Sequence, residues 1–90
     1  MTKEINFFDK TLASFTETEK EVLALDSETP ESILLKLAFD SSENVRALVG
    51  INKNTPELIL RELKKDPSKL VQRTASYSLD NRIWKKVENN

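Results

Sequence analysis

The side chains best able to do chemistry are basic, and they gather in the second half of the chain. Three groups of side chains stand at i, i+3, i+4 or i, i+4, i+8 spacing, so each group shares one face of a helix. The groups are Arg61, Lys64 and Lys65; Lys69, Arg73 and Tyr77; and Arg82, Lys85 and Lys86. If the fold aligns these faces, they form one basic surface with an aromatic ring in it, which suits phosphates or an acidic protein. The alternative is ordinary solvent-facing side chains, such as the i, i+4 pair of Glu57 and Arg61.

The other residue types argue against most catalytic and metal chemistry. The sequence has no histidine and no cysteine, so the commonest general base, the thiol nucleophile and the usual zinc ligands are missing. The single glycine, Gly50, excludes the glycine-rich phosphate loops. Glu17, Glu19 and Glu21 stand in the first turn of a predicted helix, where solvated carboxylates are expected. We therefore expect a protein that is not an enzyme and takes no cofactor.

Charge is distributed unevenly along the chain. The net charge is −1, but residues 1–45 hold four lysines against ten acids, whereas residues 46–90 hold ten Lys/Arg against five acids. Such asymmetry indicates either a partner for one half or solvated helix faces that differ in sign. No apolar run approaches the ~20 residues that span a bilayer, and no signal-peptide pattern opens the chain. We expect a cytoplasmic protein with no membrane contact.

The chain repeats itself with a period of 26, which carries Thr29 onto Thr55. When residues 29–45 are laid over residues 55–71, nine of the seventeen positions are identical. The identical residues in the first copy are Thr29, Pro30, Glu31, Ile33, Leu34, Leu37, Asp40, Ser42 and Val45. Weaker matches on either side divide this single domain into an N-terminal cap with a half-unit, two full units and a C-terminal half-unit. Their bounds are 1–28, 29–54, 55–80 and 81–90.

Each full unit is predicted to be a pair of helices. Thr29 is expected to cap the first helix, with Pro30 at the first helical position, where its missing N–H costs nothing. Ser41 or Ser42 is expected to cap the second helix. In the next unit the same roles fall to Thr55-Pro56 and Asp66-Pro67.

Two further helix starts flank the full units. Thr16 to Glu19 fits the capping-box pattern, in which each side chain bonds the other residue's backbone N–H. Asp80 is expected to cap a short last helix.

Apolar side chains at helical spacing explain why the units should stack. The first helix of a unit carries one stripe and the second helix carries another. In the first full unit the stripes are Ile33, Leu34 and Leu37, and Val45, Leu48, Val49 and Ile51. A single unit is too small to bury both stripes alone, so neighbouring units must bury them against each other.

Over residues 17–80 the chain resembles the leucine-rich repeat variant family, whose short helical repeats are HEAT-like. Val45-Arg46, Thr55-Pro56 and Ile59-Leu60 follow one another at the spacing of that family's Val-Arg, Thr-Pro and Leu-Leu. The chain departs from the family at Lys53, where the family has proline, and at Gln72, where it has arginine. The resemblance implies an all-α fold, a small right-handed helical-repeat solenoid of about two and a half helix pairs. It also implies a scaffold role without catalytic residues.

Three positions leave two interpretations open. Arg46 follows the apolar Val45, and it either lines the junction between units as a binding residue or makes an intramolecular salt bridge or helix cap. Trp84, in the last half-unit, either packs as core or stays exposed as a contact anchor. The same question arises at the other end, in a segment that either caps the stack or offers an apolar face to a partner or a second copy; its apolar residues are Phe7, Phe8, Leu12 and Phe15.

Three functions remain open. The first is binding of another protein, as an adaptor or an inhibitor. The second, from a different class, is binding of nucleic acid or phosphate through the basic half. The third is head-to-tail self-association, acidic end to basic end.

Overall fold

The computed structural model describes residues 12–88, and their side chains as far as residue 83. This part of the chain is all-helical and contains no strand. It consists of a 3-10 helix, Leu12–Ser14, followed by α1 (Glu17–Leu25), α2 (Glu31–Leu37), α3 (Glu43–Ile51), α4 (Glu57–Leu63) and α5 (Lys69–Glu88). Phe7 and Phe8, and the side chains of Trp84, Lys85 and Lys86, lie outside the described part.

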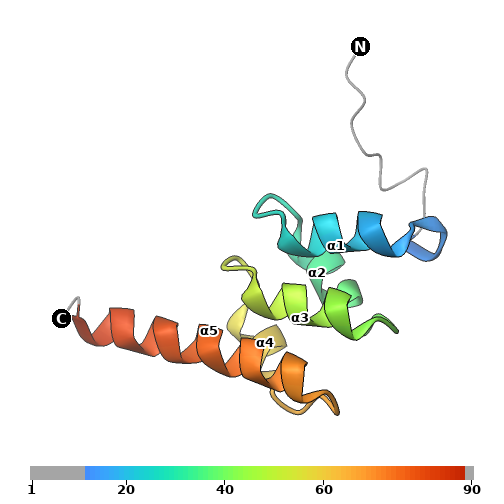
Figure 1. Cartoon of the computed structure of the whole chain (residues 1–90). Coiled ribbons are helices and arrows are strands. Elements are labelled where there is room, and N and C mark those ends of the chain that lie inside the picture. Colours follow the sequence, from blue (N-terminus) through green and yellow to red (C-terminus); the bar gives the residue numbers. More distant parts are fainter. Residues whose placement is uncertain (1–11, 89–90) are drawn as a thin grey trace.

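The helices form two layers. α1, α3 and α5 lie side by side in one layer, and α2 and α4 lie behind them (Figure 1). α2 contacts both α1 and α3, and α4 contacts both α3 and α5, so each short helix joins two neighbours of the first layer. α5 is the longest helix, and its last turns extend beyond the end of α3 (Figure 1).

Two predicted helix starts are confirmed. Thr16 and Glu19 form a full capping box: the Thr16 hydroxyl accepts from the Glu19 N–H at 3.1 Å, and the Glu19 carboxylate accepts from the Thr16 N–H at 2.9 Å. Ser42 caps α3 by accepting from the Val45 N–H at 3.3 Å. Ser68 does the same for Val71 in α5. These bonds satisfy backbone donors that have no partner within the helix.

The expected caps at Thr29, Thr55 and Asp66 are wrong. Both threonines are buried, and each hydroxyl donates backwards to a carbonyl in the last turn of the preceding helix. The Thr29 hydroxyl donates to the Leu23 carbonyl at 2.6 Å, and the Thr55 hydroxyl donates to the Val49 carbonyl at 2.7 Å. Asp66 accepts from the Ser68 N–H instead of capping α5 itself. The threonines therefore tie consecutive helices together, which a pattern of local capping does not reveal.

The expected helix start at Asp80 is also wrong. α5 runs without interruption from Lys69 to Glu88, and Asp80 lies exposed in its middle. Proline and glycine are absent from this stretch, so nothing breaks the backbone hydrogen bonds of the helix. The residues of the last two predicted segments, 55–80 and 81–90, are thus joined by one helix.

The core lies between the two layers and follows both predicted stripes. Leu34, Leu37, Val45 and Val49 are buried, whereas Ile51 is exposed and leaves its stripe. The remaining core residues are Phe15, Leu23, Ala24, Ala38, Ala47, Ile59, Leu60, Leu63, Val71, Ala75 and Leu79. Each large aliphatic side chain buried here stabilises the fold by about 1.5–3 kcal/mol relative to an exposed one. Among the described residues, no helix is long and apolar enough to cross a membrane.

Gly50 allows α3 and α5 to approach each other closely. A Cβ atom at this position would collide with the Thr74 hydroxyl and would lie 3.3 Å from the Ala75 backbone nitrogen. The backbone of Gly50 is ordinary helix, so space and not conformation requires glycine here. This close contact fixes how α5 lies against α3, and therefore shapes the surface between them.

Candidate binding groove

Arg46 joins two successive parts of the chain and has little surface exposed. Its Nε donates to Asp66 Oδ2 at 2.8 Å, its Nη2 to Asp66 Oδ1 at 3.1 Å and its Nη1 to the Asp40 carbonyl at 2.8 Å. Burial opposes ionisation of Asp66, but hydrogen bonds from Arg46 and the Ser68 N–H outweigh it and hold the pKa of that carboxyl below its ordinary value. The interpretation of Arg46 as an intramolecular salt bridge is confirmed, and three of its five N–H donors are engaged within the protein.

The contacts of Arg46 recur at the equivalent positions of the neighbouring units. Lys20 pairs with Asp40 at 2.8 Å, as Arg46 pairs with Asp66. Gln72 donates to the Asp66 carbonyl at 2.6 Å, as Arg46 donates to the Asp40 carbonyl. The same polar contacts therefore recur one sequence period apart, even where the sequence replaces arginine with lysine or glutamine.

Asn52 is a structural residue that the sequence did not single out. Its buried side chain donates to the Ala24 carbonyl at 2.8 Å and to the Asp26 carbonyl at 3.0 Å, at the end of α1. Ser78, one repeat later, donates to the Gly50 carbonyl in α3. The bonds to Ala24 and Gly50 satisfy carbonyls in the last turn of a helix, which have no partner within the helix, while the Asp26 carbonyl also accepts from the Thr29 N–H at 3.1 Å. The signal for them was present, because Asp26, Asn52 and Ser78 stand one sequence period from each other.

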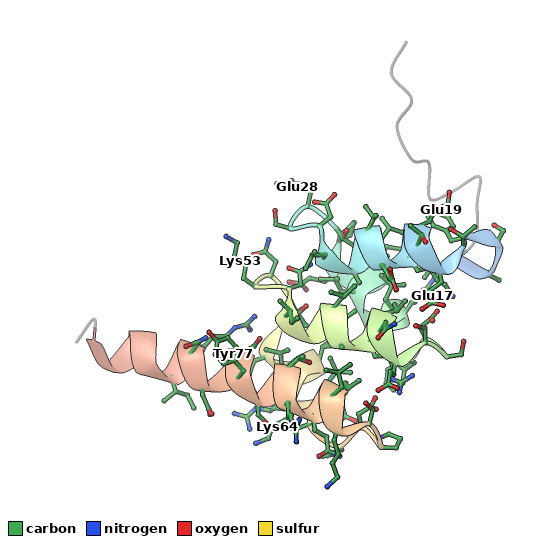
Figure 2. The ribbon with its side chains drawn as sticks, viewed as in Figure 1. Glu17, Glu19, Glu28, Lys53, Lys64 and Tyr77 are labelled. Atoms are coloured by element: carbon green, nitrogen blue, oxygen red, sulfur yellow. The ribbon has the colours of Figure 1, made fainter. Side chains whose placement is uncertain are left out.

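An open groove lies between the end of α3, the loop after it and the exposed side of α5. Its volume is about 620 Å³, and its lining residues are Ile51, Lys53, Arg73, Thr74, Tyr77, Ser78, Asn81 and Arg82. Figure 2 shows Lys53 on the loop after α3 and Tyr77 on the helix beneath it. Arg82 donates from Nη2 to the Lys53 carbonyl at 2.9 Å, which ties α5 to this loop. We call this feature the α3–α5 groove.

The α3–α5 groove combines positive charge with large exposed hydrophobic groups. Lys53, Arg73 and Arg82 contribute three cations, and no carboxylate is among the lining residues. Ile51 and Tyr77 are 51% and 69% exposed. Three of the predicted binding residues, Arg73, Tyr77 and Arg82, thus meet here, whereas Lys53 and Ile51 were not predicted as binding residues because they lie on another helix pair.

The remaining predicted basic residues do not line this groove. Arg61 on α4 pairs with Glu57, and Lys65 lies 3.6 Å from a carboxylate oxygen of Glu62. Lys64 and Lys69 are exposed outside the lining. The three basic groups therefore do not share one surface among the described side chains; α4 presents paired charges, and α5 presents the groove.

Large apolar side chains are exposed at equivalent positions of the first helix layer. Leu25, Ile51 and Tyr77 occupy the same place in three successive repeats and lie on α1, α3 and α5. All three are at least half exposed. Because these helices lie side by side, the three positions form a row that crosses the layer and ends in the α3–α5 groove (Figure 1). We call this row the apolar row. The sequence period was the signal that could have found it.

A second groove, of about 400 Å³, lies between α2 and α4. It is lined by Leu35, Ala38, Phe39, Asp40, Arg46, Ile59, Glu62, Leu63, Lys65, Asp66 and Pro67. Its charged side chains are largely paired with one another: Arg46 with Asp66, and Lys65 with Glu62. Phe39 is exposed at its edge, but the charges around it largely cancel.

The outer side of α5 differs from the sides of α1 and α3 that pack on the next helix. Ala24 and Gly50 are buried small residues, and the equivalent position on α5 is the partly buried Ser76. Ala47 is buried, and its equivalent on α5 is the exposed Arg73. A further helix packed in the same way would have to desolvate the Arg73 charge, which is costly without a partner.

Comparison with known proteins finds no relatives: no family model, no curated protein and no solved structure matches the chain. The resemblance to leucine-rich repeat variants therefore stands only on the residues quoted for it. Within the described residues, no group of three acidic, histidine or cysteine side chains is placed to hold a metal ion.

Proposed function

We propose that this chain is a non-catalytic protein-binding module, built as a short right-handed solenoid of helix pairs similar to leucine-rich repeat variants. The stacking proposal is supported by hydrogen bonds that recur at equivalent positions of successive repeats. Ser42 donates to Glu17, and Ser68 donates to Glu43. The hydrogen bonds from the Thr29 and Thr55 hydroxyls to the preceding helix recur at equivalent positions. So do the ion pairs of Lys20 with Asp40 and of Arg46 with Asp66.

The observation that carries the binding proposal is the apolar row. Leu25, Ile51 and Tyr77 each leave at least half of their surface in water, which is unfavourable for a large apolar side chain without a partner. Aromatic and aliphatic anchors of this kind commonly dominate the energy of protein interfaces, with charged groups around them. A partner protein would cover the row and contact the charges beside it.

Nucleic-acid binding is the second candidate, because the α3–α5 groove offers Arg73 and Lys53 beside the stacking surface of Tyr77. Two features favour a protein instead. The row continues from Tyr77 into aliphatic side chains that offer a base no stacking surface. The loop after α1, at the same end of the layer as Lys53, carries the exposed Glu28, whose charge repels a phosphate backbone (Figure 2).

Self-association by continued stacking is the third candidate. The outer side of α5 makes this less favourable, because a second copy would have to desolvate the exposed Arg73 and the partly buried Ser76.

The proposed function is tested by quantitative affinity capture from a cell extract. The bait is the full chain, and it is compared with a variant that replaces Leu25, Ile51 and Tyr77 by serine. Leu58→Ser is the matched control, since Leu58 is 78% exposed on α4 and lies outside both grooves. We expect a captured protein that the triple variant loses and Leu58→Ser retains. Equal capture by both variants contradicts the proposal, as does binding of labelled oligonucleotides alone.

A further inference from the structure

We infer that the α3–α5 groove takes a segment of the partner protein in which acidic side chains flank a large apolar one. This inference rests on the proposed protein-binding function and names the chemistry of its partner. It follows from three properties of the groove: an uncompensated positive charge, an apolar floor, and an arginine already held in position.

The positive charge of the groove has no acidic partner among the residues that the structure describes. Among the described residues, no carboxylate forms an ion pair with Lys53, Arg73 or Arg82. Lys20, Arg46, Arg61 and Lys65, by contrast, all pair with acids. Lys36, Lys64 and Lys69 are likewise without an ion pair among the described residues, but they lie outside the groove. The groove is therefore the place where three unpaired cations meet, and where an external carboxylate can pair with more than one of them.

The geometry favours a peptide in which acidic and apolar side chains alternate over a single bound anion. Ile51 and Tyr77 come from different helices and expose apolar surface between the cations. A lone phosphate or carboxylate would leave this surface in water. A peptide with an aliphatic or aromatic side chain between Asp or Glu residues would cover it and pair the cations at the same time.

Arg82 is the best-positioned of the three cations. One of its five N–H donors binds the Lys53 carbonyl at 2.9 Å, so the guanidinium has less freedom to lose when it binds. The other donors remain able to bind a carboxylate in bidentate geometry. Thr74, Ser78 and Asn81 add uncharged polar groups along the same side of α5.

A second copy of the chain is a weaker occupant, although the first half is acidic. Several of its carboxylates are already engaged in the structure. Glu17 accepts from Ser42, Glu19 accepts from the Thr16 N–H, and Asp40 pairs with Lys20. Presenting them to another molecule would break the cap of α1 or contacts between elements.

The test is a selection from a random dodecapeptide library displayed on phage, with the full chain as target. We expect enriched peptides to carry Asp or Glu next to Leu, Ile, Phe or Trp. Replacing their acids with Asn and Gln should weaken binding by roughly tenfold or more, as loss of close charge pairs does. Arg73→Glu should weaken the unmodified peptide similarly. Lys64→Glu, an exposed change at the end of α4 outside the groove, should bind it like the unmodified protein.

Several results would overturn the inference. One is enrichment of peptides without acids, or peptide-induced amide shifts that map to the groove between α2 and α4. A second is displacement of the peptide by a short single-stranded oligonucleotide at near-physiological salt. A third is a dimer in sedimentation experiments that the peptide dissociates, which would mean that a second copy occupies the groove. If such results occur while a captured protein still depends on the apolar row, the inference fails and the proposed function stands. If no captured protein depends on the row either, both fail.

Discussion

Arg46 and Asp66 form a two-pronged ion pair, with Nε–Oδ2 and Nη2–Oδ1 distances of 2.8 and 3.1 Å, between α3 and the loop before α5. The third arm of the guanidinium reaches the Asp40 carbonyl, so one side chain binds the loops that follow both α2 and α4. Lys20 and Asp40 make the simpler form of the same contact one repeat earlier. These two pairs are the polar joints between the helix pairs.

Removing one member of the Arg46–Asp66 pair should destabilise the protein strongly. Both side chains are mostly buried, so Arg46→Ala leaves an unpaired carboxylate and should lower the free energy of unfolding by about 2–4 kcal/mol. Arg61→Ala is the control, because it breaks an exposed i, i+4 pair and should cost less than about 0.5 kcal/mol. Urea unfolding followed by circular dichroism measures both. Equal, small decreases in the free energy of unfolding for the two variants would show that the Arg46–Asp66 pair does not stabilise the fold.

Acid should weaken the same joints. The pKa values of Asp40 and Asp66 in the folded protein lie below their ordinary value of 3.8. As the pH falls, the unfolded chain therefore takes up protons first, so the contribution to stability is complete above about pH 5 and is lost as the pH passes through the folded pKa values. The free energy of unfolding of Asp66→Asn should fall less between neutral pH and about pH 3 than that of the unmodified protein. Parallel pH profiles for the two proteins would contradict this linkage.

Gly50→Ala should destabilise the protein although alanine favours helices. The added methyl group would collide with the Thr74 hydroxyl, and overpacking of this kind costs about 1–3 kcal/mol, which exceeds the gain of about 1 kcal/mol in helix propensity. The double variant Gly50→Ala/Thr74→Ala should recover part of the loss, because the hydroxyl that collides is gone. Thermal unfolding of the two variants measures this recovery. If the double variant is no more stable than Gly50→Ala, the hydroxyl of Thr74 does not limit the space at Gly50, and the contact between α3 and α5 is looser than in the structure.

Asn52→Ala should lower the free energy of unfolding by about 1–3 kcal/mol, because the Ala24 carbonyl at the end of α1 loses its donor, whereas the Asp26 carbonyl keeps the Thr29 N–H. Asn44→Ala is the control: Asn44 is exposed in the first turn of α3, and its loss should change stability by less than about 0.5 kcal/mol. The difference between the two midpoints of urea unfolding is the quantity to compare. No difference would mean that water replaces the Asn52 amide.

The helices and most of the core could be predicted from the sequence because they depend on local pattern. The caps at Thr16 and Ser42 and the stripe of Leu34 and Leu37 follow from neighbours within one or two turns. Thr29 could not be placed, because a threonine before a proline suits an N-cap and a backward hydrogen bond equally well. Only the packing of the preceding helix decides between them.

The candidate site was less accessible to sequence reasoning. Arg73, Tyr77 and Arg82 stand on one helix, so their spacing was enough to group them. Ile51 and Lys53 join them only because the close contact at Gly50 sets α5 against α3 and because α5 continues past Asp80. The first condition is tertiary, and the predicted helix start at Asp80 concealed the second.

The most direct measurement is the dissociation constant between the unmodified chain and a protein captured from the extract, compared with those of Tyr77→Ser and Leu58→Ser. Both variants remove a large exposed side chain, so neither should change the free energy of unfolding appreciably. We expect Tyr77→Ser to weaken binding by about tenfold or more, as loss of an aromatic anchor does, and Leu58→Ser to leave it unchanged. Equal dissociation constants for all three proteins would contradict binding through the apolar row.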